Sequence, residues 1–251
     1  MKRFDVVCAG AALWRASGAA AIFDVVEALA RQGLSVGLST ALDDDRRSRH
    51  ALAKAAALGV DTTGVTLSPP SREIVVVDTA GGESQVLSEG RELTISPDWS
   101  ADILLLHGCS PVTSHAAALV RAARTARRSG GVVVLDLAGN LRQWAGRDPR
   151  TIAMTLREVD IVHSTVMDLA IIGTDSSEVR RAMRAPSTIV LHDLVASTAT
   201  GAFGEVRVQR SSSSSMQRSH GDCVAAICLD LARPPRNESL AARWNRVLRA
   251  A

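Results

Sequence analysis

Residues 102–136, DILLLHGCSPVTSHAAALVRAARTARRSGGVVVLD, contain the pattern that decides the fold. Asp102–His107 and Val132–Asp136 are short, largely apolar runs, which are typical of strands buried on both faces of a sheet. Between them, Ser114–Ser129 is an alanine-rich stretch that predicts a helix and is followed by Gly130-Gly131, since glycine is common just past a helix end. Two buried strands joined by a helix indicate neighbouring parallel strands.

The same alternation of strand and helix extends in both directions along the chain. The other predicted strands are Phe4–Ala9, Ser35–Ser39, Glu73–Asp78, Glu83–Ser88, Asp160–Ser164, Thr188–Leu191 and Glu205–Val208. The other predicted helices are Ala19–Gln32, Arg46–Leu58, Pro149–Glu158, Asp168–Ile172, Ser176–Met183, Gly221–Ala232 and Glu238–Ala250. The glycines at 81 and 82 predict a hairpin turn between two of these strands. The pattern predicts a three-layer α/β/α protein with a mostly parallel central sheet, in which ligands bind at the carboxyl ends of the strands.

The composition is that of an ordinary globular protein. Of the 251 residues, 46% are hydrophobic and 22% charged, so we expect one domain over residues 1–251, with the serine-rich residues 209–219 as a mobile loop. The net charge of +3 comes from dispersed arginines, and aromatic residues make up only 3%, which argues against nucleic-acid binding. Because no apolar run is long enough to span a membrane and the N-terminus does not resemble a signal peptide, we expect a cytoplasmic protein without membrane contact.

The cysteines and histidines show no metal-binding pattern along the chain. Cys8, Cys109, Cys223 and Cys228 lack paired spacing, and the six histidines are equally dispersed. We therefore expect reduced, buried thiols and no protein metal site.

Several phrases spread over nearly the whole chain resemble, in the same order, those of a known family. They are DVVCAGAAL (Asp5–Leu13), the helix Ala19–Gly33 ending in ALARQG, VGLSTALDDDRRSR (Val36–Arg49), LAKAAALGVDTTGV (Leu52–Val65), VLSEG (Val86–Gly90), SPDWSADILLLHG (Ser96–Gly108), LDLAGNLRQW (Leu135–Trp144) and SHGD (Ser219–Asp222). Together they resemble the PfkB/ribokinase family of sugar and nucleoside kinases. The resemblance implies a ribokinase-like fold, a sugar or nucleoside substrate, and transfer of the γ-phosphate of ATP, with Mg²⁺, to a hydroxyl group.

Residues 219–222 stand where the family carries its G-A-G-D signature. The resemblance implies that Asp222 is the general base, and that Ser219, His220 and Gly221 form an anion hole at a helix start. Taken alone, the local sequence favours a simple helix cap for Asp222. His220 replaces a small residue and either crowds the phosphate path or adds charge to it.

The substrate side departs from the family in part. Arg15 lies near the position of the family's sugar-binding acid, and Asp24 matches its sugar-binding asparagine. These two residues either bind substrate or pair with each other. Only residues 16–18 replace the family's lid segment, so we expect the lid to be reduced or absent, and any homodimer to use another surface such as the hairpin Glu73–Ser88. Asp136, Asn140 and Arg142 match the family's D-x-N-x-R stretch. Asn140 and Arg142 follow a buried strand, and either they bind substrate or Asp136 and Asn140 order the loop through hydrogen bonds.

The nucleotide side departs further. Ser164 and Met167 replace the asparagine and glutamate of the family's N-x-x-E motif, and Asp168 lies one residue out of register. His192 and Asp193 stand where the family has a glycine close to ATP. The residues after the signature helix are fewer than in the family, so we expect an incomplete adenine wall.

Three functions remain open from the sequence. The first is a carbohydrate kinase with Asp222 as base, Ser164, His192 and Asp193 on the nucleotide side, and ATP with Mg²⁺. The second is a degenerate, kinase-like protein with little or no ATP turnover that binds a small ligand or acts as an accessory protein and needs no cofactor. The third is an enzyme that uses the same cleft for other chemistry, with His220, Asp222 and Arg15 as acid, base and anchor.

Overall fold

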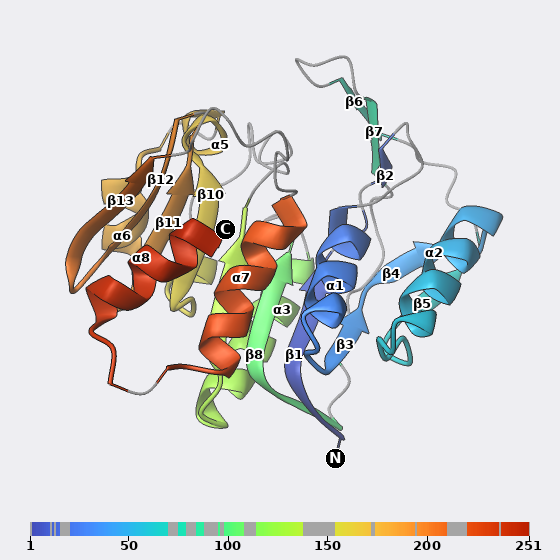
Figure 1. Cartoon of the computed structure of the whole chain (residues 1–251). Coiled ribbons are helices and arrows are strands. Elements are labelled where there is room, and N and C mark those ends of the chain that lie inside the picture. The colour runs from blue at the N-terminus through green and yellow to red at the C-terminus, as the bar shows by residue number, and fades with distance from the viewer. Residues whose placement is uncertain are drawn as a thin grey trace.

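An eight-stranded sheet forms the centre of the fold in the computed structural model (Figure 1). The structure describes residues 2–10, 12, 14–15, 21–69, 75–78, 84–87, 95, 98–107, 114–137, 154–171, 174–193, 195–209, 220–235 and 237–250. The strands are β1 (Lys2–Gly10), β2 (Trp14–Arg15), β3 (Val36–Ser39), β4 (Ala41–Asp43), β5 (Thr66–Ser68), β6 (Val75–Asp78), β7 (Ser84–Leu87), β8 (Trp99–His107), β9 (Val132–Asp136), β10 (Ile161–Thr165), β11 (Thr188–His192), β12 (Ala196–Gly201) and β13 (Gly204–Gln209). The helices are α1 (Ala21–Arg31), α2 (Arg46–Ala57), α3 (Ser114–Arg128), α5 (Val166–Ile171), α6 (Ser176–Ala182), α7 (His220–Ala232) and α8 (Leu240–Ala250).

The sheet order confirms the predicted mostly parallel sheet. The strands run in the order β13-β12-β11-β10-β9-β8-β1-β3, and every neighbouring pair from β3 to β11 is parallel. β12 and β13 extend the sheet antiparallel to β11. As a result, the carboxyl ends of β1, β8, β9, β10 and β11 meet along one edge, which is where the site is built.

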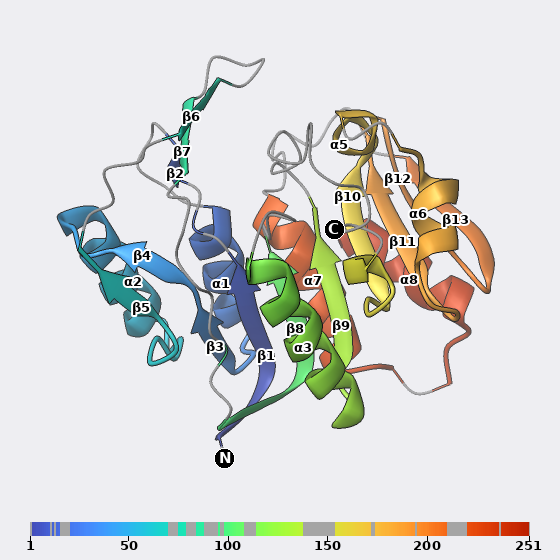
Figure 2. The same ribbon diagram turned by 180° about the vertical axis from the view of Figure 1, so that it is seen from behind.

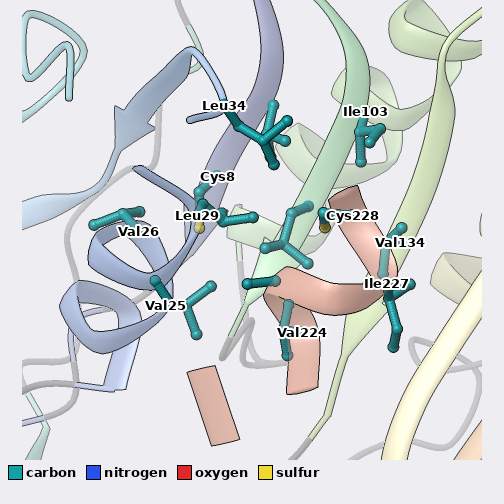
Figure 3. Close-up of a cluster of buried hydrophobic side chains, with 14 of the residues drawn as sticks. Cys8, Val25, Val26, Leu29, Leu34, Ile103, Val134, Val224, Ile227 and Cys228 are labelled. Carbon is teal, nitrogen blue, oxygen red and sulfur yellow. The ribbon is translucent and has the colours of Figure 1, made fainter. Parts of the chain in front are cut away.

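Helices cover both faces of this sheet and make the three layers. α1, α7 and α8 lie on the face seen in Figure 1, and α3 and α6 lie on the opposite face, seen in Figure 2. Between α1, α7 and the sheet lies an apolar cluster that includes Leu29, Ile103 and Ile227 (Figure 3). All three side chains are essentially inaccessible to solvent. This packing fixes the first turns of α1 and α7 beside the carboxyl ends of the strands.

Several short strands are absent from the sequence prediction. The antiparallel pair β6–β7 confirms the predicted hairpin, but the structure adds β2 to it, so that a separate sheet has the order β2-β7-β6. β4 and β5 form a two-stranded sheet of their own. β12 was also missed, and α5 begins at Val166 rather than at Asp168.

Two predicted segments fall largely outside the described residues. Of the predicted helix Pro149–Glu158, the structure describes residues 154–158, and residues 154–156 are helical. Of the predicted loop 209–219, it describes Gln209 as the last residue of β13. Among the helices that the structure describes, none combines the length and hydropathy needed to cross a bilayer.

Candidate active site

The last residues of β8 and β9 stand side by side at the carboxyl edge of the sheet. His107 ends β8 and pairs in register with Asp136, which ends β9. Gly10, the last residue of β1, lies on the other side of His107. On β10, His163 is the register partner of Asp136. The parallel sheet therefore gathers polar side chains that are far apart in the sequence.

Asp136 lies at the centre of a histidine cluster. The Nδ1 atom of His107 is 2.5 Å from one Asp136 carboxylate oxygen, and the Nε2 atom of His220 is 2.7 Å from the same oxygen. The Nδ1 atom of His163 is 2.9 Å from the other oxygen. Asp136, His107 and His163 are buried, whereas the His220 side chain is 26% exposed. One carboxylate thus ties together β8, β9, β10 and the first residue of α7.

A fourth histidine extends the cluster toward β11. The ring of His192 packs edge-on against that of His163, with 4.8 Å between the ring centres. The Nδ1 atom of His192 lies 2.6 Å from the hydroxyl of Ser197 on β12. Four of the six histidines therefore lie at one end of the sheet.

The surroundings of Asp136 favour its ionised form. Burial alone would raise the pKa of this carboxyl group, but the charges of His220 and His107 and the hydrogen bonds from His107 and His163 hold the pKa of Asp136 well below its usual value. For His163, burial lowers the pKa, and hydrogen bonding and the charge of Asp136 oppose that shift. The cluster thus places one buried negative charge among imidazoles.

Sequence reasoning missed this cluster because its members are dispersed along the chain. A usable signal was present, however. His107, Asp136 and His192 are the last residues of the buried strands β8, β9 and β11. His163 lies within β10, the strand between β9 and β11. Since parallel strands end at the same edge of a sheet, polar residues that close apolar runs are candidates for a shared site.

The first turns of α1 and α7 bring the predicted residues Asp24, Gly221 and Asp222 together. A Cβ atom on Gly221 would lie only 2.8 Å from the backbone oxygen of Asp24 and 3.3 Å from the backbone nitrogen of Val25. Glycine at position 221 therefore permits the two helix starts to touch. Asp24 and Asp222 lie in the first turns of the two helices that meet at this contact.

We expect Gly221→Ala to destabilise the protein by about 1–3 kcal/mol, because the added methyl group forces α1 and α7 apart. Within most helices the same change is stabilising, by up to about 1 kcal/mol. Chemical denaturation followed by circular dichroism gives the sign directly. An alanine variant as stable as the original chain, or more stable, would contradict the close contact between the two helices.

Comparisons with known proteins find similar folds among solved structures. No family model matches the sequence, and no curated protein matches it. Among solved structures, aminoimidazole riboside kinase from Salmonella enterica superposes with a TM-score of 0.74 over 98% of this chain and 90% of its own, at 17% identity. Fructokinase from Vibrio cholerae O395, with fructose, ADP and calcium bound, gives 0.71 over 97% and 89%, at 15% identity. A PfkB protein from Polaromonas sp. JS666 gives 0.66 over 98% and 94%, at 18% identity.

This chain has the PfkB/ribokinase fold. The small sheet β2-β7-β6 stands beyond the carboxyl edge of the main sheet, on the side of α1 (Figures 1 and 2). That this small sheet is the reduced lid stays a prediction. Arg15 belongs to this sheet, where its backbone pairs with that of Gln85. The predicted pairing of Arg15 with Asp24 stays a prediction.

The residues predicted to lie on the nucleotide side, Ser164, His192 and Asp193, each contact other residues of this chain. The hydroxyl of Ser164 is buried and donates to the backbone oxygen of Thr165 at 3.2 Å. A carboxylate oxygen of Asp193 accepts from the backbone nitrogens of Val195 and Ala196, at 2.7 and 2.6 Å, and so closes the turn between β11 and β12. His192 belongs to the histidine cluster. The cofactor-binding roles assigned to Ser164, His192 and Asp193 stay predictions.

The positions that match the magnesium motif do not fit the ion. The side chain of Met167 is exposed and has no oxygen to offer. The carboxylate of Asp168 is largely buried and accepts a hydrogen bond from the hydroxyl of Thr165 at 2.7 Å, which in turn accepts from the Asp168 backbone nitrogen. These contacts describe a helix cap at the start of α5.

Three of the predicted residues, Ser219, Asn140 and Arg142, lie outside the described part of the chain. A hollow of about 510 Å³ does exist among described residues, but it lies at the amino end of β9, away from the histidine cluster. Two of its arginines, Arg124 and Arg127, pair with Glu158. We therefore place the candidate active site at the carboxyl edge, around Asp222 and the histidine cluster.

Proposed function

We propose that this chain is a carbohydrate kinase of the PfkB type, which transfers the γ-phosphate of ATP to a hydroxyl group of a sugar or nucleoside. The observation that carries the proposal is the position of Asp222. It lies in the first turn of α7, where the helix begins at the carboxyl edge of a PfkB/ribokinase sheet and touches the first turn of α1. Solved proteins of this fold include kinases with fructose and ADP, or with aminoimidazole riboside and an ATP analogue, bound.

The start of α7 has the chemistry that phosphoryl transfer needs. The backbone N–H groups of a helix start and the positive end of the helix dipole both favour a phosphate group at this position. In the proposed reaction, Asp222 takes the proton from the acceptor hydroxyl, whose oxygen bonds to the γ-phosphorus as the bond to the β-phosphate oxygen breaks and ADP leaves. His220 is anchored on Asp136, which fixes its imidazole at this helix start.

The substrate side supports a polyhydroxyl ligand. The Asp24 backbone lies against Gly221, the residue before Asp222, and the Asp24 carboxylate can accept hydrogen bonds from hydroxyl groups. ATP is the phosphate donor in this proposal. We derive no step through Mg²⁺ bound at the motif positions 164 and 167, because those residues do not fit the ion.

The test is phosphate transfer from ATP to a panel of sugars and nucleosides, measured as ADP release together with the mass of the product. We expect Asp222→Asn to lower kcat by about 10²–10⁴-fold, the usual contribution of a general base. Asp175→Asn is the matched control, because Asp175 caps the exposed start of α6 and asparagine caps equally well.

Undiminished transfer in Asp222→Asn would remove Asp222 from the role of base. Absence of transfer to every acceptor, with wild-type folding, would instead favour a ligand-binding protein without turnover. The residues at the magnesium-motif positions do not fit the ion, and this observation supports the second function.

A further inference from the structure

We propose that His107, Asp136 and His220 form a binding site for a divalent transition-metal ion, with zinc as the best match. Each residue offers one ligand atom, and these atoms all lie within 4.8 Å of one another. No other group of three histidine, cysteine or acidic side chains with this geometry occurs in the part of the chain that the structure describes. The proposal does not depend on the kinase function, since it concerns an ion that the protein itself would hold.

The donor atoms match zinc better than magnesium. Two imidazole nitrogens and one carboxylate oxygen are a common ligand set for Zn²⁺, with water or substrate completing the coordination. Mg²⁺ prefers six oxygen ligands and retains several water molecules, which this nitrogen-rich set does not suit. The chemistry of the site therefore selects a borderline ion over a hard one.

The ligands come from rigid parts of the fold. His107 and Asp136 are the final residues of two adjacent central strands, and His220 is the first residue of α7. The carboxylate of Asp136 is also held in its orientation through its other oxygen, which lies 2.9 Å from the Nδ1 atom of His163. Such an outer partner commonly fixes a ligating carboxylate or imidazole and contributes about 10–100-fold to metal affinity.

The site has one accessible side. The side chains of His107 and Asp136 are at most 1% exposed, whereas that of His220 is 26% exposed. An ion would therefore enter past His220, which is the first residue of α7. This places the ion next to the proposed phosphate-binding turn.

Only a small movement is needed to seat an ion. His107 and His220 now contact Asp136 directly, with nitrogen–oxygen distances of 2.5 and 2.7 Å. Ligand atoms about 2.0–2.2 Å from a tetrahedral zinc ion lie about 3.3–3.6 Å from each other. Both nitrogen–oxygen distances must therefore lengthen by about 0.6–1.1 Å, with the larger change between His107 and Asp136.

The experiment uses metal-free full-length protein and no nucleotide. We expect Zn²⁺ to bind with one ion per chain in calorimetry, and Co²⁺ to give visible absorption bands with nitrogen and oxygen ligands. His220→Ala should weaken zinc affinity by on the order of 100-fold or more, since it removes a direct ligand and not merely an outer partner. A large excess of Mg²⁺ should leave the zinc titration unchanged.

Two controls separate this proposal from others. His50→Ala removes an exposed histidine of α2 and should leave zinc affinity unchanged. Asp222→Asn should also retain zinc affinity even if phosphate transfer is lost, so that failure of one proposal does not imply failure of the other. Absence of Zn²⁺ binding, or equal affinity in wild type and His220→Ala, would show that the cluster is only a hydrogen-bonded network and overturn the metal site.

Discussion

Replacing Asp136 with alanine is expected to destabilise the metal-free protein by about 3–5 kcal/mol, because it removes a buried carboxylate and leaves buried imidazoles without their common acceptor. Asp136 is fully buried and is the common acceptor for His107, His163 and His220. Without it, two fully buried imidazoles keep their desolvation cost but lose their acceptor. Urea denaturation monitored by circular dichroism measures the change, and the slope of the transition shows whether the unfolding remains two-state.

A second variant keeps this prediction testable if the alanine protein does not fold. Asp136→Asn has nearly the same shape and retains one acceptor oxygen, so we expect a smaller loss than for alanine. Asp175→Ala, which removes the exposed cap of α6, is expected to cost only about 1 kcal/mol. If Asp136→Ala costs no more than Asp175→Ala, the histidine cluster is not the buried charged network described above.

Replacing Gly10 with alanine should have a comparably large effect, about 3 kcal/mol or more, because there is no room for a methyl group. A Cβ atom at this position would lie 1.6 Å from the backbone oxygen of His107 and 2.7 Å from its carbonyl carbon. Both atoms belong to the neighbouring central strand, so β1 and β8 must separate where they approach the site. Chemical denaturation gives the loss of stability, and the zinc titration reports whether His107 has moved.

Gly130→Ala is the matched control for this change. Gly130 has a φ of +83°, but an added Cβ atom meets nothing within 4 Å. Only backbone strain of about 1–2 kcal/mol is expected there. A Gly10→Ala protein with unchanged stability and unchanged zinc affinity would contradict the close approach of β1 to His107.

The fold was largely predictable because its strands are continuous apolar runs. Val132–Asp136 was predicted and is β9 without change, and the run ending at His107 was predicted and is the second half of β8. β12 was not predictable in this way, because residues 196–201, ASTATG, contain no such run. It forms a strand by pairing with β11 and β13, an effect of tertiary structure on a weak local preference.

The sequence suggested candidate site residues at the starts of two helices but did not lead to the histidine cluster. Gly221, Asp222 and Asp24 were proposed from the resemblance to the family's motifs, and in the structure the Asp24 backbone lies against Gly221. The histidine cluster draws its members from separate strands and from α7. Its existence depends on the order of strands in the sheet, which spacing along the chain does not reveal.

The most direct test of the proposed kinase function is a crystal structure with a non-hydrolysable ATP analogue and an accepted sugar or nucleoside bound. We predict that the γ-phosphate lies against the first backbone N–H groups of α7, and that the acceptor hydroxyl lies within about 3 Å of the Asp222 carboxylate, as a general base requires. A nucleotide bound away from the start of α7, or a hydroxyl out of reach of Asp222, would contradict the account.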